Sequence, residues 1–155
     1  MKNINTYLIF DGNCRKAMEF YKKCLGGVLY LSAYSEMPGG CEDLPKKCKD
    51  WILHARLTIR SAVLMASDTR PGVPIRQGNN FFVSINCESI KEAAKLFKAL
   101  GQKGTIEMPL QETFWATRFG MLTDQFGIKW MVNFDKPTEK YLVQPKRVYE
   151  RKIKK

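Results

Sequence analysis

The sequence predicts an α+β fold in which two β-α-β-β-β modules pack together and form a cupped mixed sheet. The main observation is a repeat. Residues 8–26 (LIFDGNCRKAMEFYKKCLG) and residues 83–101 (VSINCESIKEAAKLFKALG) each combine a short apolar strand, a polar turn, an amphipathic helix and a terminal glycine. Three further strand-like segments follow each copy. A module of this size cannot bury the apolar face of its own sheet, so the two copies are expected to share a core.

The first module is expected at about residues 3–68. Residues 4–10 alternate between polar and apolar side chains, as a strand does. Asn13 is a suitable N-cap for the helix that follows, and Gly26 with Gly27 can supply the left-handed residue that ends this helix. The other strands of the module are predicted at residues 28–34, 51–59 and 62–67.

The predicted strand at residues 51–59 has two chemically different faces. One face is apolar and suits packing under a helix; it consists of Trp51, Leu53, Ala55, Leu57 and Ile59. The opposite face suits the wall of a polar cavity; it consists of Ile52, His54, Arg56 and Thr58.

Residues 35–50 form a loop rich in proline, glycine and charge, and loops of this length are commonly lids or partner surfaces. The second module is expected at about residues 79–134. Asp124 is predicted to cap backbone amides in the turn that Gly127 completes. The module contains a strand near 80–86, a helix at 89–100, and strands near 104–108, 114–122 and 128–134.

The basic charge of the chain is concentrated at its C-terminal end. The formal net charge is +11, and residues 135–155 hold eight Lys or Arg against three acids, or +5 of that total. This segment is predicted to be a basic tail outside the folded domain of residues 1–134. The domain has no basic stripe interleaved with aromatic residues, so a nucleic-acid partner is not expected.

The composition also indicates a compartment. No apolar run approaches the ~20 residues that span a bilayer, and the first ten residues lack a separate signal-peptide core. The five cysteines are an odd number without a CxxC pair, which favours reduced thiols over a disulfide framework. We therefore expect a cytoplasmic protein with no membrane partner.

Three segments carry a family resemblance. They are YLIFDGN…AMEFYKKCLGG near the start, HARLTIRSAVLMASD in the middle, and MPLQETFWATRFGMLTDQFGIKWMVNF from Met108 to Phe134. In this order and spacing they resemble the PhnB-like branch of the vicinal oxygen chelate superfamily, over residues 3–134. That superfamily includes glyoxalases, bleomycin- and fosfomycin-resistance proteins and extradiol dioxygenases. The branch is also labelled demethylubiquinone methyltransferase-like, but this chain has no Gly-rich methyl-donor loop after a strand.

The resemblance implies paired βαβββ modules, a homodimer and, in the enzymes, a divalent metal at the floor of the cup. Its ligands would be two His, Glu or Gln side chains from each module. The matching positions hold none of these residue types; they fall near Asn5, Met65 to Ser67, Asn80 and Met131. Asp68 is the one carboxylate beside them, and one carboxylate does not hold a catalytic metal. We therefore expect neither a metal nor another cofactor.

Six residues are the candidates for ligand binding: His54, Arg56, Trp115, Arg118, Phe119 and Trp130. His54 is the single histidine and can orient a ligand or act as a base, although packing beside Arg56 is the alternative. Arg118 lies between aromatic residues that can stack on a planar ligand while the guanidinium binds its anionic group. Strand alternation places Trp115 and Arg118 on opposite faces unless a bulge intervenes. For Trp130 the alternative is core packing.

Three functional hypotheses follow. The first is a homodimer that binds a small aromatic or anionic organic molecule without a catalytic metal. The second is a metal-dependent lyase, isomerase or dioxygenase of the same superfamily. The third is an interaction protein whose basic tail binds an acidic partner. The sequence leaves open whether a reaction is catalysed.

Overall fold

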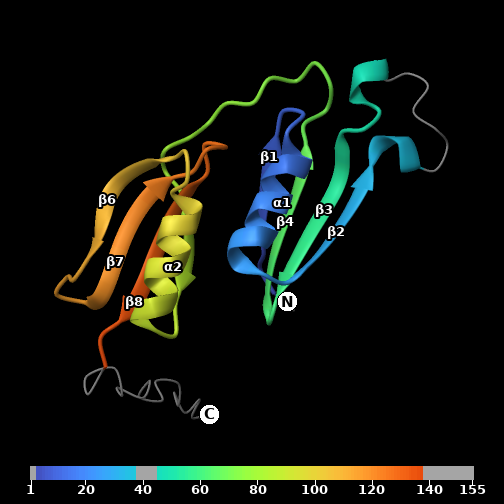
Figure 1. The fold of residues 1–155 in the computed structure, drawn as a ribbon. Helices are drawn as coiled ribbons and strands as arrows, with labels where there is room; N and C mark the ends of the chain where they lie inside the picture. Colours follow the sequence, from blue (N-terminus) through green and yellow to red (C-terminus); the bar gives the residue numbers. More distant parts are fainter. Residues whose placement is uncertain (1–2, 38–44, 138–155) are drawn as a thin grey trace, which may run out of the picture.

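A computed structural model describes residues 3–37 and 45–137, and it contains two modules of the same design (Figure 1). The first consists of β1 (Thr6–Phe10), α1 (Cys14–Leu25), β2 (Val28–Ala33), β3 (Ile52–Ile59) and β4 (Ala62–Asp68). The second consists of β5 (Val83–Asn86), α2 (Ile90–Leu100), β6 (Thr105–Gln111), β7 (Ala116–Thr123) and β8 (Lys129–Asp135).

The strand orders confirm the duplication. One sheet has the order β1-β4-β3-β2 and the other β5-β8-β7-β6, and in each the first strand is parallel to the last strand of its module. The eight strands thus form two four-stranded mixed sheets rather than one continuous sheet. The two-module α+β prediction is confirmed.

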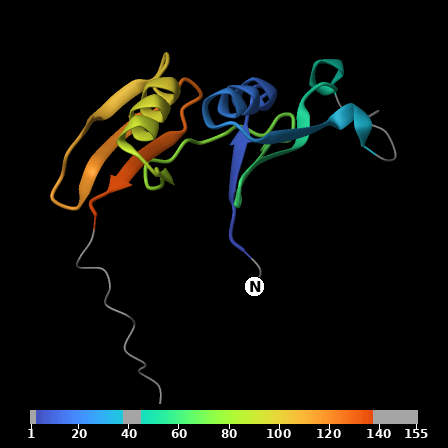
Figure 2. The ribbon, with the colours of Figure 1, turned by 60° about the horizontal axis from the view of Figure 1, so that its bottom comes forward.

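Both helices lie on the same side of the sheets and contact each other (Figure 2). The opposite faces of the two sheets are not covered by any helix or strand of the described residues. Alternation along β1 shows this, because Leu8 and Phe10 are buried whereas Tyr7 and Ile9 are half exposed. The molecule therefore has a helix side, which buries the core, and an uncovered side.

A buried carboxylate joins the two modules. Asp124, at the end of β7, accepts hydrogen bonds from the Tyr21 hydroxyl of α1 at 2.7 Å and from the Trp130 indole N–H at 2.8 Å. It also accepts from the backbone amides of Phe126 at 2.8 Å and Ile128 at 3.0 Å, which confirms the predicted turn cap. A buried carboxylate needs such partners because it has lost its contacts with water.

A second buried carboxylate corrects the predicted N-cap. Asn13 makes no side-chain hydrogen bond to α1. Asp68, at the end of β4, instead accepts from the backbone N–H of Cys14 at 3.0 Å and from that of Ile52 at 2.7 Å. The free amide N–H groups at a helix start can donate to any suitably placed acceptor, and here a carboxylate at the end of β4 is that acceptor.

The two-face prediction for β3 holds only from His54 onward. Ala55 and Leu57 are buried, and His54 and Arg56 lie on the uncovered side. Ile52, predicted on the polar face, is fully buried instead. The reason is a register shift opposite Ser32 and Ala33, which reverses the side of the sheet to which the strand start points.

Two predicted features lie largely outside the described residues. The loop at 35–50 begins and ends with short 3-10 helices, η1 (Tyr34–Glu36) and η2 (Lys46–Cys48), and its residues 38–44, including Cys41, are not described. Most of the basic tail, residues 138–155, also lies outside. Within the described ranges, no helix is long and apolar enough to cross a bilayer.

The junction around Tyr21 should make stability depend on alkaline pH. Burial, with the charge and hydrogen bond of Asp124, raises the pKa of the Tyr21 phenol far above its usual range. The folded protein therefore holds this proton more tightly than the unfolded chain. The contribution of the protonated Tyr21 phenol to the free energy of unfolding is complete below about pH 10. Above that pH it falls by about 1.4 kcal/mol per pH unit.

We expect Tyr21→Phe to lower the free energy of unfolding by about 1 to 2 kcal/mol at pH 8 and to make its decline above pH 10 less steep. Denaturant unfolding of both proteins from pH 8 to 11 measures this. Burial also raises the pKa of the Cys14 thiol, but that residue is common to both proteins and cancels in the comparison. If the free energy of unfolding declines equally steeply with pH in both proteins, the Tyr21 phenol does not stabilise the junction as proposed.

Candidate functional site

The uncovered face of the first sheet brings His54 and Arg56 together with tyrosines. Strand pairing places four side chains in one row across the sheet, in the order Tyr7, Met65, Arg56 and Tyr30. The Tyr7 hydroxyl and His54 Nδ1 are 3.3 Å apart, so the hydroxyl donates to Nδ1 when the imidazole proton is on Nε2. This face offers a phenol, an imidazole and a guanidinium to solvent.

The uncovered face of the second sheet has different chemistry. Strand pairing gives the row Ser84, Met131, Met121 and Met108. The neighbouring row consists of Asn86, Asn133, Phe119 and Gln111. This face is therefore built mainly from flexible thioethers, an aromatic ring and amides.

The structure brings together Trp115 and Phe119 but separates Arg118 from them. The Trp115 and Phe119 rings lie 5.5 Å apart in an edge-to-face arrangement. Arg118 pairs across the sheet with Phe134, on the opposite side from Phe119, and its guanidinium donates to the Thr117 carbonyl at 2.7 Å. A bulge does occur between Ala116 and Arg118, but it does not place the arginine beside the aromatic pair.

Trp130 lies in the core. Its side chain is 1% exposed, packs edge-to-face on Tyr21 with the ring centres 5.2 Å apart, and donates its N–H to Asp124. This geometry favours the packing role and leaves little surface for a ligand.

The residues do not fit a divalent metal centre of the kind the resemblance implies. Within residues 3–37 and 45–137 no three His, Cys, Asp or Glu side chains come together as possible ligands. Both Asp68 oxygens already accept backbone amides. Met65 and Met131 offer soft thioethers, which hard divalent ions do not favour.

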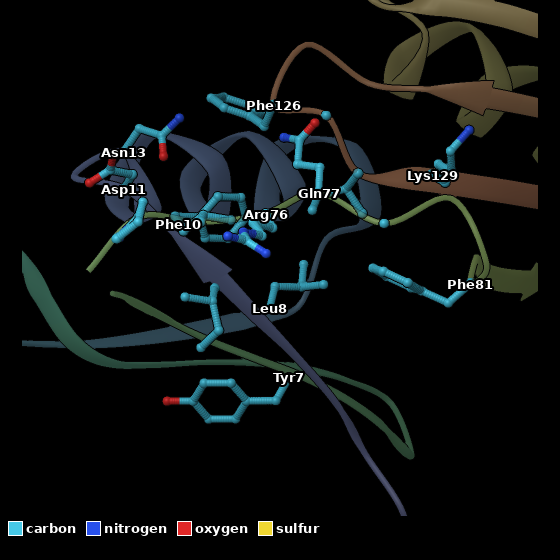
Figure 3. A pocket seen from close by; sticks show the side chains of 16 residues that line it. Tyr7, Leu8, Phe10, Asp11, Asn13, Arg76, Gln77, Phe81, Phe126 and Lys129 are labelled. Atoms are coloured by element: carbon cyan, nitrogen blue, oxygen red, sulfur yellow. The ribbon is translucent and has the colours of Figure 1, made fainter. Parts of the chain in front are cut away.

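A cavity of about 530 Å³ lies between the modules (Figure 3). Its walls come from β1, from the linker of residues 69–82 and from the turn between β7 and β8. The aromatic lining residues are Tyr7, Phe10, Phe81 and Phe126, and the polar ones are Asp11, Asn13, Arg76, Gln77 and Lys129.

The β7–β8 turn holds two of these walls in place. Phe126 packs against Phe10, Phe20 and Tyr21, with ring centres 5.6 to 6.5 Å apart. Gly127 has a φ of +82°, and a Cβ at this position would collide with the Gln77 side-chain amide. The linker therefore rests directly on the turn, and this contact bounds the cavity.

The three charged groups of the cavity are not equivalent. Lys129 Nζ lies 2.5 Å from Glu107 Oε1 and 5.2 Å from the centre of the Phe82 ring. Hydrogen bonds from Lys129 and Thr123 lower the pKa of Glu107, so this pair is largely neutral as a unit. Arg76 has no carboxylate oxygen within 4.0 Å among the described residues, although Asp11 lines the same cavity.

None of the six residues predicted from the sequence lines this cavity. Tyr7 connects it to them, since it lines the cavity and contacts His54. The linker residues Arg76, Gln77 and Phe81 were missed. The available signal was the length of this connection, which lies where the two repeats join.

Comparison with known proteins agrees with this architecture. Residues 3–132 match the family model of the Glyoxalase/Bleomycin resistance protein/Dioxygenase superfamily. The chain is 35% identical over 146 residues to protein YjdN of Escherichia coli K12, covering 88% of this chain and 99% of that protein.

Two solved structures are similar over most of their length. Protein PA1353 of Pseudomonas aeruginosa is 43% identical, with a TM-score of 0.79 over 87% of this chain and 98% of that one. The PhnB protein of Bacillus cereus is 26% identical, with a TM-score of 0.70 over 86% of this chain and 99% of that one.

The contact of Gln77 with Gly127 can be tested by amide spectra. We expect Gly127→Ala to lower the free energy of unfolding by about 1 to 2 kcal/mol for its positive φ. The added methyl group should also displace the flexible Gln77 side chain and shift its side-chain amide signal. Gly72→Ala is the control, because Gly72 has a φ of +85° and a methyl group added there would meet nothing within 4 Å. An unchanged Gln77 amide signal in Gly127→Ala would show that the linker does not rest on the turn.

Proposed function

Because the chain belongs to the glyoxalase/bleomycin resistance protein/dioxygenase superfamily, within its PhnB-like branch, we propose that it binds a small organic molecule in the cavity between its modules. The cavity itself carries this proposal. Its volume of about 530 Å³ falls within the range of roughly 300 to 1,000 Å³ that is usual for small-molecule sites. Its walls combine aromatic rings with a few polar groups, which is the usual composition of such sites.

The aromatic walls are available to a ligand. Phe81 is 50% exposed although it is a large apolar side chain, and it stands beside the cavity in Figure 3. Tyr7 continues the wall toward His54 and Arg56, which we propose as the polar rim of the site. Trp115 and Phe119 pack on each other on the second sheet and do not line this cavity.

Binding without a catalytic metal is part of the proposal. It is supported by the donor chemistry, because the one carboxylate near the expected ligand positions caps α1 and β3. A ligand would instead be held by stacking on aromatic rings and by hydrogen bonds.

We also propose that two copies of the chain associate through their uncovered sheet faces. Val28 and Tyr30 on β2 are 74% and 60% exposed, and Tyr30 lies on the uncovered face of the first sheet. The methionine row lies on the uncovered face of the second sheet. Apolar side chains on the side that no helix covers support association with a second copy there.

A ligand screen tests the binding proposal. Small aromatic and anionic molecules are expected to raise the melting temperature, and Phe81→Ala should weaken each true ligand about three- to tenfold through lost ring contact. Isothermal titration calorimetry measures the affinities.

Ile90→Ala is the control for that screen, because it removes an exposed apolar side chain of α2, on the helix side, that does not line the cavity. Its affinities should equal those of the unmodified protein, with or without EDTA. If Phe81→Ala leaves the affinity of a ligand unchanged, the binding site lies elsewhere. A screen in which no molecule binds would refute the proposal.

The association proposal predicts a particle of twice the 17.9 kDa chain mass in light scattering. Met121→Glu should shift it toward the monomer, because its cross-strand neighbours Met108 and Met131 are uncharged and a buried unpaired charge at an interface is costly. Ala94→Glu adds the same charge at an exposed position on α2, on the helix side, and should leave the dimer intact. A monomeric unmodified protein would rule out this mode of association.

A further inference from the structure

We infer that the cavity selects a planar organic anion whose negative group binds the guanidinium of Arg76. This inference rests on the proposed function, since it names the class of ligand that the same cavity takes. The inference is supported by the positions and partners of the charged and polar groups that line the cavity.

Arg76 is the cationic group of the cavity that is free to bind a ligand. It lies on the linker, its side chain is exposed, and within the described residues no carboxylate oxygen comes within 4.0 Å of it. A guanidinium presents a planar set of N–H donors that matches a carboxylate in a two-point hydrogen bond. An arginine lining a cavity without an acidic partner is therefore suited to receive an acid from solution.

The other two charged lining residues, Lys129 and Asp11, affect such a ligand differently. Lys129 is already paired with Glu107 and adds little net charge. Asp11 lies with Asn13 at one end of the cavity, whereas Lys129 and Phe81 lie at the other, and Arg76 stands between them (Figure 3). Repulsion from Asp11 disfavours an anionic group at that end, so the anion is directed to Arg76.

Gln77 supplies a second, neutral donor next to Arg76. Its side-chain amide lies next to Gly127, where an added Cβ would displace it. From the cavity wall this amide can donate a hydrogen bond to a ligand held by Arg76.

The shape of the ligand follows from the walls. Phe81 and Phe126 offer ring faces or edges, and flat conjugated groups stack on such rings better than puckered ones. Benzoate combines both features and is smaller than the cavity, so it serves as a probe of the site rather than as its natural occupant.

The test compares probes that share size and differ in charge or planarity. Benzoate, benzyl alcohol, benzylamine, cyclohexanecarboxylate and inorganic phosphate are titrated into the full-length protein and followed by ¹H–¹⁵N correlation spectra. Benzoate should bind with a Kd on the order of 1 mM or below. The shifted amides should include Gly78, Phe81 and Gly127, which line the cavity. The other four probes should bind at least several-fold more weakly.

Arg76→Gln should lower the affinity for benzoate about ten- to hundredfold and leave the affinity for benzyl alcohol unchanged. Arg70→Gln is the matched control: it is an exposed arginine of the same linker that does not line the cavity, and it changes the net charge equally. Its effect should be below twofold. Asp11→Asn removes the repelling carboxylate and should not weaken benzoate.

The outcomes separate this inference from the function on which it rests. If benzyl alcohol or benzylamine binds as well as benzoate, and Phe81→Ala weakens all three, the cavity binds small molecules but does not select anions. Equal losses in Arg76→Gln and Arg70→Gln would show a general charge effect and overturn the inference. If phosphate binds as tightly as benzoate, the cavity does not recognise the planar part of the ligand, and the inference is wrong on that point. If no probe binds and the wider screen is also empty, both proposals fail.

Discussion

The arrangement of the two modules depends on one buried carboxylate, Asp124. It holds the β7–β8 turn closed through two backbone amides and ties that turn to α1 through the Tyr21 hydroxyl. Phe126 and Gly127 belong to the same turn and form part of the cavity. The interaction that orients the modules therefore also positions a wall of the proposed site. The packing of the modules and the shape of the cavity are therefore physically coupled at this point.

The duplicated fold separates positions that must be alike from positions that can differ. Core positions repeat because each helix needs an apolar sheet face beneath it. The uncovered rows do not repeat, since one sheet has Tyr7, Met65, Arg56 and Tyr30 in a row and the other has Ser84 and three methionines. One face is aromatic and cationic, and the other is lined by thioethers. The two modules of the chain thus share one backbone design but present two different chemical surfaces.

The sequence predicted what depends on local pattern and missed what depends on distant residues. The repeat, the order of the elements and the turn cap of Asp124 are encoded in nearby residues, and the structure confirms them. The N-cap function came from Asp68 instead of Asn13, because a strand 54 residues away supplies the acceptor. Ile52 was assigned to the wrong face, since a bulge leaves no signal in an alternating pattern. His54 and Arg56 were placed on the correct face, but the cavity was not predicted from the sequence.

The cavity could not be predicted because it belongs to neither module. It exists where a strand edge, a turn and the linker meet, and periodicity within a segment carries no information about such meetings. The linker is also the part of this fold with the fewest packing constraints, because it is mostly exposed and forms no strand or helix. Residues such as Arg76 can therefore change without disturbing either core. A fold of this kind can acquire a new ligand through its linker while both modules stay the same, which is how one scaffold comes to serve unrelated functions.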